Sequence, residues 1–557
     1  MRTLGISALL FLCMTAAAQE QPRTSETIEV SVVNVDVVVT DRDGNRVTGL
    51  TADDFEILES KKRQTITNFT EYRGDGAVDP EARGDRPAGL VAAPRAPRTV
   101  VLFIESTRML DFDAKRIFAG LRTMVRDTIG PRDRVMVVSW LQNGMQHRLL
   151  ERQPFTSDVA RVDALLAQMQ DEAIHGPRDL ESNLLDLDAA DAALMRSANV
   201  DGAVGSPSVH ANEAMLRERY LTRKKAAALE TLMHSIAGFE GRKVLLMAVQ
   251  RFGAFAGNGL FGDGAIPIER RPEFSNRTLH DSLISTANAT GVSIYPVYPP
   301  GLRTSLGGGA ATGGDPSGPD RDLAVGARGY NVLFNQTLAL DAIAEDTGGL
   351  MAWGAGNIAE MLPRMADDLE TYYSLGYRAP GTTRGIVRKL EVRAKNRGYK
   401  VRNRSQFVEK SETEAIKDRV IANLYQSFPG SIPFDIEAGE PRSTGRNRWE
   451  LPVTVRIPIS SLTTLPDGSG SAGEFSVYAA AGSVLGVTSE VQRRTQAFTI
   501  PASDVDKAKA SHFTYEVVLQ IDEKSNRVSV GVVDETGRES GFKQITIPSR
   551  GVKAASR

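Results

Sequence analysis

The side chains best suited to catalysis do not stand at spacings that catalysis uses. The six histidines form no His-Glu-x-x-His motif and no pair at i and i+4, so a zinc hydrolase is not indicated. The Gly-x-Ser-x-Gly and Walker motifs are also absent. Ser106, next to Glu105, could act as a nucleophile, but no base that would activate it can be recognised. We therefore expect no catalytic residues, and an unrecognised hydrolase is kept as an alternative.

Two acidic residues follow an apolar run closely enough to suggest a cation site. Residues 99–104 (TVVLFI) read as a buried strand, and Asp111 and Asp113 come soon after it. Carboxylate oxygens are ligands that Mg²⁺ accepts. Asp113 also stands directly before a run with helical spacing, a position typical of a helix N-cap. We favour the capping role.

The charge balance argues against polyanionic partners. The 557 residues contain 67 Lys and Arg against 69 Asp and Glu, a formal net charge of −2. A chain without net positive charge lacks the field that draws in nucleic acid or an anionic membrane. We expect neither as a main partner.

The N-terminus has the pattern of a secretory signal. An apolar run over residues 6–14 follows Arg2, and small residues precede Gln19, so we expect cleavage after Ala18. The sole cysteine, Cys13, would be removed with this segment. No later apolar stretch reaches the roughly 18 residues of a membrane span. We expect an exported protein, periplasmic or extracellular, without a membrane span in the mature chain.

The remaining chain divides into a β-module, an α/β domain and a C-terminal β-rich domain. Alternating apolar residues and turns predict a small β-module over 19–72, and a Gly/Pro/Arg-rich linker follows over 73–97. Buried-strand runs then alternate with helical patterns, which predicts an open, doubly wound α/β domain. We place that domain at 98–405, including 372–377 as one of its last elements, and predict a β-sandwich-like domain over 406–557.

Two insertions interrupt the α/β pattern. Residues 171–212 are acidic and rich in alanine, which suggests a helix or helix pair, and residues 301–329 are rich in glycine, which suggests a loop.

Four separated stretches form a recognisable series along the chain: VVVTDRDGNRVTGLTADDFEILE (37–59), GFEGRKVLLM (238–247), LDAIAEDTGGLM (340–351) and YYSLGY (372–377). Their order resembles bacterial exported proteins with a von Willebrand factor type A (VWA)-related domain. The resemblance implies a Rossmann-like fold that holds a protein partner. In standard VWA domains an Asp-x-Ser-x-Ser motif, a Thr and a second Asp bind Mg²⁺ at the carboxyl edge of the sheet, and a partner's carboxylate completes the coordination.

This sequence departs from that cation-binding pattern. The resemblance aligns Glu105 with the first Asp, Thr107 with the first hydroxyl and Met109 with the second. Gln250 stands at the position of the second Asp, and Arg251 adds a positive charge beside it. A lost hydroxyl, a longer carboxylate and a nearby cation do not suit the strict octahedral geometry of Mg²⁺. We expect Glu105 to form an ion pair with Arg108 or Arg251.

These observations favour a non-catalytic exported binding, adhesion or scaffold protein with a degenerate metal site. The expected partner-binding positions lie at that site: Glu105, Thr107, Met109, Gln250 and Arg251. The partner would be a protein of unknown identity, and no cofactor is expected. Mg²⁺-dependent adhesion, with Glu105, Thr107 and Asp111 holding the ion, is an alternative.

Overall fold

The computed structural model describes most of the chain in segments. These are residues 32–74, 76–78, 96–105, 109, 111–143, 146–175, 209–257, 271–299, 319–379, 385–428, 430–468, 470–483, 488–523 and 525–547. The expected signal segment, most of the linker and most of both insertions lie outside them.

A mostly parallel sheet forms the centre of the α/β domain. Across the sheet the order is β11–β10–β9–β6–β7–β8, and each neighbouring pair is parallel except β7 with β8. The strands span Ala352–Trp353 (β11), Val292–Tyr298 (β10), Lys243–Ala248 (β9), Thr99–Ile104 (β6), Arg134–Asn143 (β7) and Gln146–Thr156 (β8). The chain therefore starts in the middle at β6, builds outward to one side and then crosses over to build the other.

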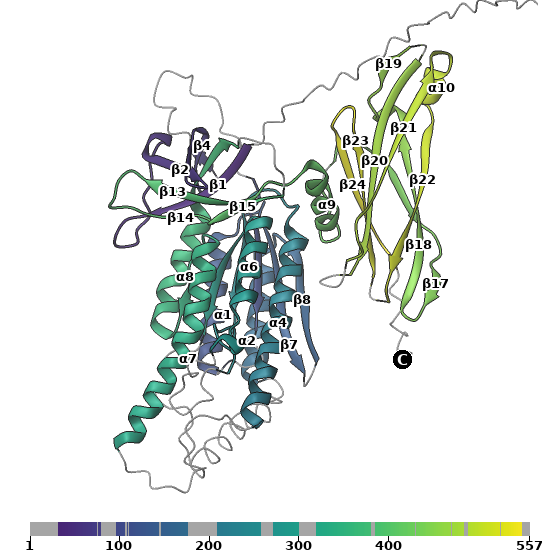
Figure 1. The fold of residues 1–557 in the computed structure, drawn as a ribbon. Coiled ribbons are helices and arrows are strands. Elements are labelled where there is room, and N and C mark those ends of the chain that lie inside the picture. The colour runs from purple at the N-terminus through teal and green to yellow at the C-terminus, as the bar shows by residue number, and fades with distance from the viewer. Residues whose placement is uncertain are drawn as a thin grey trace, which may run out of the picture.

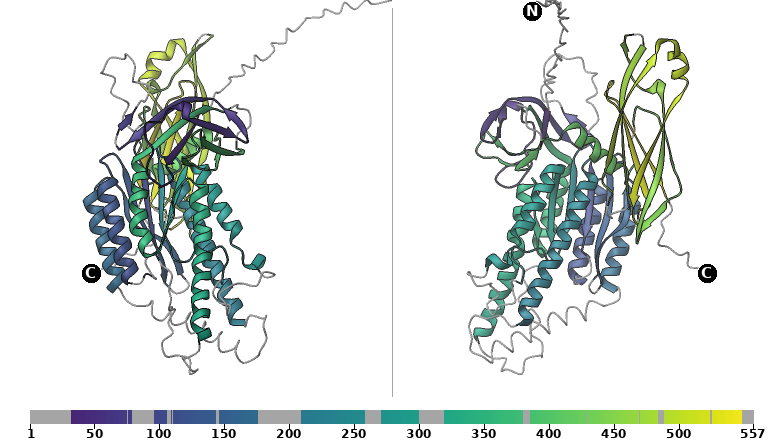
Figure 2. Two further views of the ribbon diagram at one scale, coloured as in Figure 1. Left: turned by 90° about the vertical axis from the view of Figure 1, so that its left-hand side faces the viewer. Right: turned by 45° about the vertical axis from the view of Figure 1, so that its right-hand side comes forward.

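Helices cover both faces of this sheet, as Figures 1 and 2 show. One face carries α1 (Asp111–Thr128), α2 (Val159–His175) and α8 (Ala355–Glu370), and the other carries α4 (Val209–Ile236), α6 (Arg277–Thr290) and α7 (Pro319–Asp346). Successive residues of β6 alternate between the two apolar cores, with Val101 and Phe103 in one and Leu102 and Ile104 in the other. Burial on both faces explains the continuous apolar runs of the sequence. The predicted α/β class, with a mostly parallel sheet between helices, is confirmed.

The N-terminal β-module recruits residues from far along the chain. One of its sheets has the order β14–β1–β12–β4–β5 and the other β15–β13–β2–β3. The early strands span Val32–Thr40 (β1), Phe55–Glu59 (β2), Lys62–Gln64 (β3), Ile66–Arg73 (β4) and Gly76–Val78 (β5). The late strands span Thr371–Arg378 (β12), Val387–Ala394 (β13), Lys400–Arg402 (β14) and Gln406–Val408 (β15).

Two predicted boundaries are therefore wrong. Residues 371–408 belong with the β-module, and not with the α/β domain, because β12 pairs antiparallel with β1 and β4. Tyr373, Leu375 and Tyr377 alternate into the module's own core beside Val35 and Val37. The expected linker also starts too early, since β5 lies within it and pairs with β4.

Two antiparallel sheets pack on one shared core in the C-terminal domain. One contains β16 (Asp435–Ala438), β17 (Arg442–Gly445), β18 (Arg448–Pro458) and β22 (His512–Ile521). The other contains β19 (Leu465–Asp467), β20 (Gly470–Gly482), β21 (Gln492–Pro501), β23 (Arg527–Asp534) and β24 (Ser540–Thr546). Helix α9 (Glu412–Asn423), which the sequence did not lead us to expect, starts with a Ser411/Glu414 capping box.

Smaller corrections concern helix starts. Helix α1 begins at Asp111, so Asp113 lies in its first turn and is not the N-cap. Helix α7 begins at Pro319, so the last part of the expected glycine-rich loop over 301–329 is helical.

The Gly348-Gly349 pair of the LDAIAEDTGGLM stretch has a structural role. Gly348 has a φ of +75°, and a Cβ on Gly349 would lie 1.9 Å from the carbonyl oxygen of Ile294. Thr347 accepts a hydrogen bond from the Ile294 amide at 3.0 Å. This turn therefore closes helix α7 tightly against β10.

A buried ion pair fixes the start of the central sheet. Arg98 is 2% exposed, and its Nε donates to Asp133 Oδ2 at 3.0 Å. The same guanidinium also donates to the carbonyl of Leu369 at 3.0 Å and to that of Thr128. Arg98 thus joins β6 to the ends of α1 and α8 and to the turn before β7.

We predict that Asp133→Asn lowers the free energy of unfolding by about 3–5 kcal/mol at pH 7, because Arg98 stays buried without its counter-ion. Burial raises the pKa of Asp133, but the hydrogen bonds and charge of Arg98 outweigh it, so the pKa lies below its ordinary value. The pair therefore stabilises the fold above the unfolded-state pKa of about 3.9 and loses this effect as the pH falls through the folded-state pKa.

Denaturant unfolding between pH 2 and 7 measures both effects. The exposed Asp127, changed to Asn, is the matched control and should stay within about 0.5 kcal/mol of the wild type. Equal losses in the two variants would contradict the prediction.

Candidate functional site at the carboxyl edge of the sheet

The candidate site lies where the strand order reverses, between β6 and β9. These strands are parallel neighbours, with Ile104 opposite Ala248, and the Glu105 amide donates to the Ala248 carbonyl at 2.9 Å. Because the strands end together, the residues that follow each of them meet at one edge. Ligands of open α/β sheets generally bind at such a switch point.

Glu105 forms a buried ion pair with Lys225 of helix α4. Its Oε2 accepts from Lys225 Nζ at 2.6 Å and from the Gln250 amide at 3.0 Å. Lys225 Nζ also donates to the Arg251 carbonyl at 3.1 Å. Glu105 is 4% exposed and Lys225 3% exposed, so both charges are removed from water. The pair joins the end of β6, the segment after β9 and helix α4.

The predicted partners of Glu105 need correction. Arg251 is exposed, and it meets the ion pair through its backbone carbonyl, not its guanidinium. Arg108, the other predicted partner, lies outside the described residues.

The sequence did carry a signal for Lys225, which was missed. Arg223, Lys224 and Lys225 form a basic run that resembles a solvated helix face. Lys225, however, is in phase with the buried Leu229 and Leu232 on the apolar face of α4. A lysine on an apolar stripe requires a buried counter-ion.

The other predicted site residues are placed differently. Gln250 is 8% exposed, and its side-chain Nε2 is buried without a hydrogen-bond acceptor among the residues that the structure describes. Met109 is 3% exposed and packs into the apolar core under α1, α2 and α8, so it cannot contact a partner in this arrangement. Thr107 lies outside the described residues.

A network of side-chain amides holds the segment after β9 in place. The Phe252 amide donates to Gln336 Oε1 at 2.7 Å, and the Phe255 amide donates to Asn335 Oδ1 at 2.8 Å. Asn276 Nδ2 donates to the Gly253 carbonyl at 3.0 Å. The backbone after Gln250 is therefore held by side chains of α7 and by Asn276, which directly precedes α6.

His280 lies beneath this segment and is buried against the ring of Phe252, with 5.1 Å between ring centroids. Burial lowers the pKa of His280 to about 4, so the imidazole is neutral at physiological pH. It adds no charge to the site.

The donor set does not fit Mg²⁺. Glu105 is the carboxylate that directly follows β6, and its Oε2 already accepts a hydrogen bond from the Lys225 ammonium. Gln250 offers its backbone N–H to Glu105, and Met109 is buried in the core. Among the described residues, no group of three or more His, Cys, Asp or Glu side chains could hold a metal ion.

The comparisons with known proteins find only distant structural similarity. No protein-family model and no curated protein matches the chain. Among solved structures, the N-terminal domain of TFIIH p34 is 12% identical, with 49% of this chain and 97% of that chain covered and a TM-score of 0.21. The pilus adhesin SpaC from Lactobacillus rhamnosus GG is 8% identical, with 90% and 57% covered and a TM-score of 0.22. Similarity this low carries no inference about function.

No described helix is long and apolar enough to cross a membrane.

We predict that Lys225→Met lowers the free energy of unfolding by about 3–5 kcal/mol, because it leaves the Glu105 carboxylate buried and unpaired. Lys225→Met combined with Glu105→Gln should recover most of that loss, since neither charge then remains. Urea unfolding of the single and double variants measures the coupling.

The neighbouring exposed Lys224, changed to Met, is the control and should stay within about 0.5 kcal/mol of the wild type. If the double variant is no more stable than Lys225→Met alone, the two side chains are not coupled and the assignment is wrong.

Proposed function

We propose that this chain is an exported, non-catalytic binding or scaffold protein whose VWA-related α/β domain recognises a protein partner without a divalent cation. The observation that carries the proposal is the hydrogen bond from Lys225 Nζ to Glu105 Oε2. The ammonium takes the place that a cation would need. The order of the strands around β6 and the motif resemblance support the VWA-related assignment.

Electrostatics support independence from metal. At an effective dielectric constant of about 20, a divalent ion about 4 Å from an ammonium is repelled by about 8 kcal/mol. Glu105 cannot offset this cost fully, because Lys225 already neutralises it. A cation would have to displace Lys225 and leave that ammonium buried without its counter-ion.

The side chains at this edge favour a partner that offers an acidic group. Arg251 is exposed and directly follows the buried Gln250, so its guanidinium is accessible at this edge. Arginine binds a carboxylate through two parallel N–H groups.

Exposed aromatic side chains at the same edge suit a protein surface. Phe112, in the first turn of α1, is 67% exposed, and Trp353, at the end of β11, is 40% exposed. Aromatic residues and arginine contribute strongly to protein–protein binding energy. An acidic and apolar protein segment therefore fits this edge better than a small polar substrate.

A hydrolase has less support. Glu105 is engaged by Lys225, and His280 is buried beneath Phe252, so neither is free to act as a base toward a substrate. We also propose, from the N-terminal signal pattern, that the protein acts outside the cytoplasm.

We predict that titration of Mg²⁺ or Mn²⁺ into the full-length chain gives no saturable heat at micromolar concentrations in calorimetry, because Lys225 neutralises Glu105. Thermal unfolding should be unchanged by EDTA for the same reason. A saturable heat that Glu105→Ala abolishes would refute metal independence and favour Mg²⁺-dependent adhesion.

We further predict that an envelope-extract protein captured on the immobilised chain stays bound in EDTA, and that Arg251→Glu weakens its binding at least tenfold because like charges then meet. The exposed Arg494 on β21, changed to Glu, is the charge-matched control. Release by EDTA, or equal loss in both variants, would count against this edge as the binding face.

A further inference from the structure

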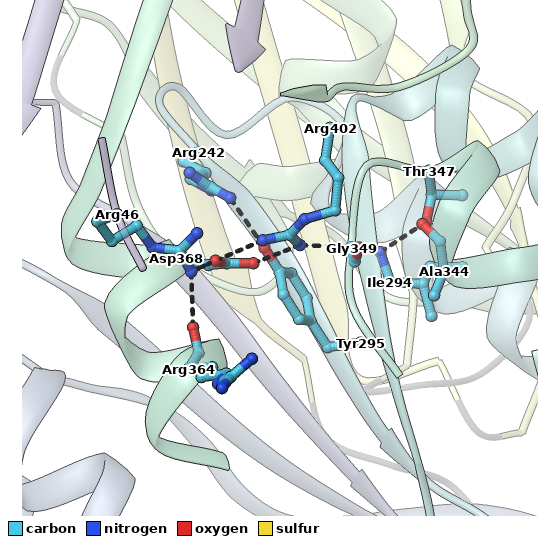
Figure 3. A network of polar contacts seen from close by, with 10 residues as sticks. All are labelled: Arg46, Arg242, Ile294, Tyr295, Ala344, Thr347, Gly349, Arg364, Asp368 and Arg402. Atoms are coloured by element: carbon cyan, nitrogen blue, oxygen red, sulfur yellow. Dashed lines mark hydrogen bonds and ion pairs between the residues drawn. The ribbon is translucent and has the colours of Figure 1, made fainter. Parts of the chain in front are cut away.

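A cluster of arginines lies at the opposite, amino edge of the sheet, where the β-module packs against the α/β domain. Figure 3 shows Arg46, Arg242 and Arg402 around the carboxylate of Asp368. Arg46 lies between β1 and β2, and Arg402 is on β14, so both come from the β-module. Arg242 directly precedes β9, and Asp368 lies near the end of α8.

Both carboxylate oxygens of Asp368 interact with two of these arginines. Arg402 Nη1 donates to Asp368 Oδ2 at 2.7 Å, and Arg402 Nη2 donates to Oδ1 at 2.8 Å. Arg46 Nη2 forms an ion pair with the same Oδ1. Asp368 is 0% exposed, so its two oxygens have little capacity left for further donors.

Four guanidinium nitrogens in the cluster remain without acceptors. Nε and Nη1 of Arg46, and Nε and Nη1 of Arg242, are buried and have no hydrogen-bond partner among the described residues. Arg242 is 5% exposed; its Nη2 donates to the Tyr295 hydroxyl at 2.9 Å, and its Cζ lies 4.6 Å from the Tyr372 ring centroid. A buried donor without an acceptor lowers the stability of the fold, and a charged donor lowers it more.

The two arginines lie within each other's electrostatic range. Burial first, and then the charges of Arg402 and Arg242, lower the pKa of Arg46 to about 10. Asp367 and Asp36 act on Arg46 and Arg242 through their charge. Neither carboxylate accepts a hydrogen bond from the four nitrogens. The missing component is a group with several acceptor atoms and a negative charge.

We propose that a small inorganic oxyanion, phosphate or sulfate, binds between Arg46 and Arg242. Nε–H and Nη1–H of one guanidinium point to different sides, so the anion's oxygens accept from one free N–H group of each arginine, and its negative charge lies between the two positive charges. Because Arg46 belongs to the β-module and Arg242 to the α/β domain, the bound anion bridges the two. It therefore stabilises their packing.

Equilibrium dialysis of the full-length chain against radiolabelled inorganic phosphate, at constant ionic strength set with chloride, tests this site. We expect about one phosphate per chain, displaced by sulfate, and a rise in melting temperature of about 3 °C at saturating phosphate. Arg46→Gln and Arg242→Gln should each reduce bound phosphate at least tenfold. Arg448→Gln, which removes an exposed arginine of the C-terminal domain, should leave it unchanged.

If Arg242→Gln does not fold, Arg46→Gln decides, because its side chain lies nearer the surface at 14% exposure. Circular dichroism verifies that the variant is folded. Absence of bound phosphate from the wild type, or phosphate binding that persists in folded Arg46→Gln, would overturn the proposal.

Discussion

The candidate site depends on a charge that must be neutralised out of water. Glu105 directly follows β6, one of the two central strands of the sheet, and is buried by α4 and the segment after β9. Burying this carboxylate alone would strongly lower the stability of the fold. The Lys225 ammonium, 2.6 Å from Glu105 Oε2, neutralises the charge and so offsets this loss. One lysine on a neighbouring helix thus supplies the positive charge that a bound ion would otherwise provide. In the proposed function, recognition of a partner would fall to the exposed side chains around the pair, such as Arg251.

The two ends of the sheet have different roles. At the amino edge, Arg98 with Asp133 and Arg402 with Asp368 join the strands and helices to one another and to the β-module. The β-module covers this end of the α/β domain in Figures 1 and 2. The carboxyl edge, with Gln250 and Arg251, lies at the other end of the strands. The Arg98–Asp133 and Arg402–Asp368 ion pairs are therefore separated from the candidate binding face by the length of the sheet.

The local pattern of the sequence was enough to predict most of the central domain. The apolar runs 99–104 and 243–248 form strands whose side chains are buried on both faces of the sheet, against a layer of helices on each side. The same reasoning failed for residues 371–378, whose alternating pattern equally suits a two-sided module strand. Antiparallel pairing of β12 with β1 joins residues more than 330 positions apart, and local periodicity contains no information about such a partner.

For the site, the sequence alone determined which oxygen and nitrogen groups follow β6 and β9. It also determined that Met109 and Gln250 cannot supply the carboxylate and hydroxyl ligands that a divalent ion needs. Only the tertiary structure decided that Lys225, 120 positions from Glu105, completes the pair. The physical reason is that the spacing of residues along α4 shows that Lys225 lies on the buried face of the helix. Which carboxylate pairs with it depends on how that helix packs against the sheet, and the sequence does not show this.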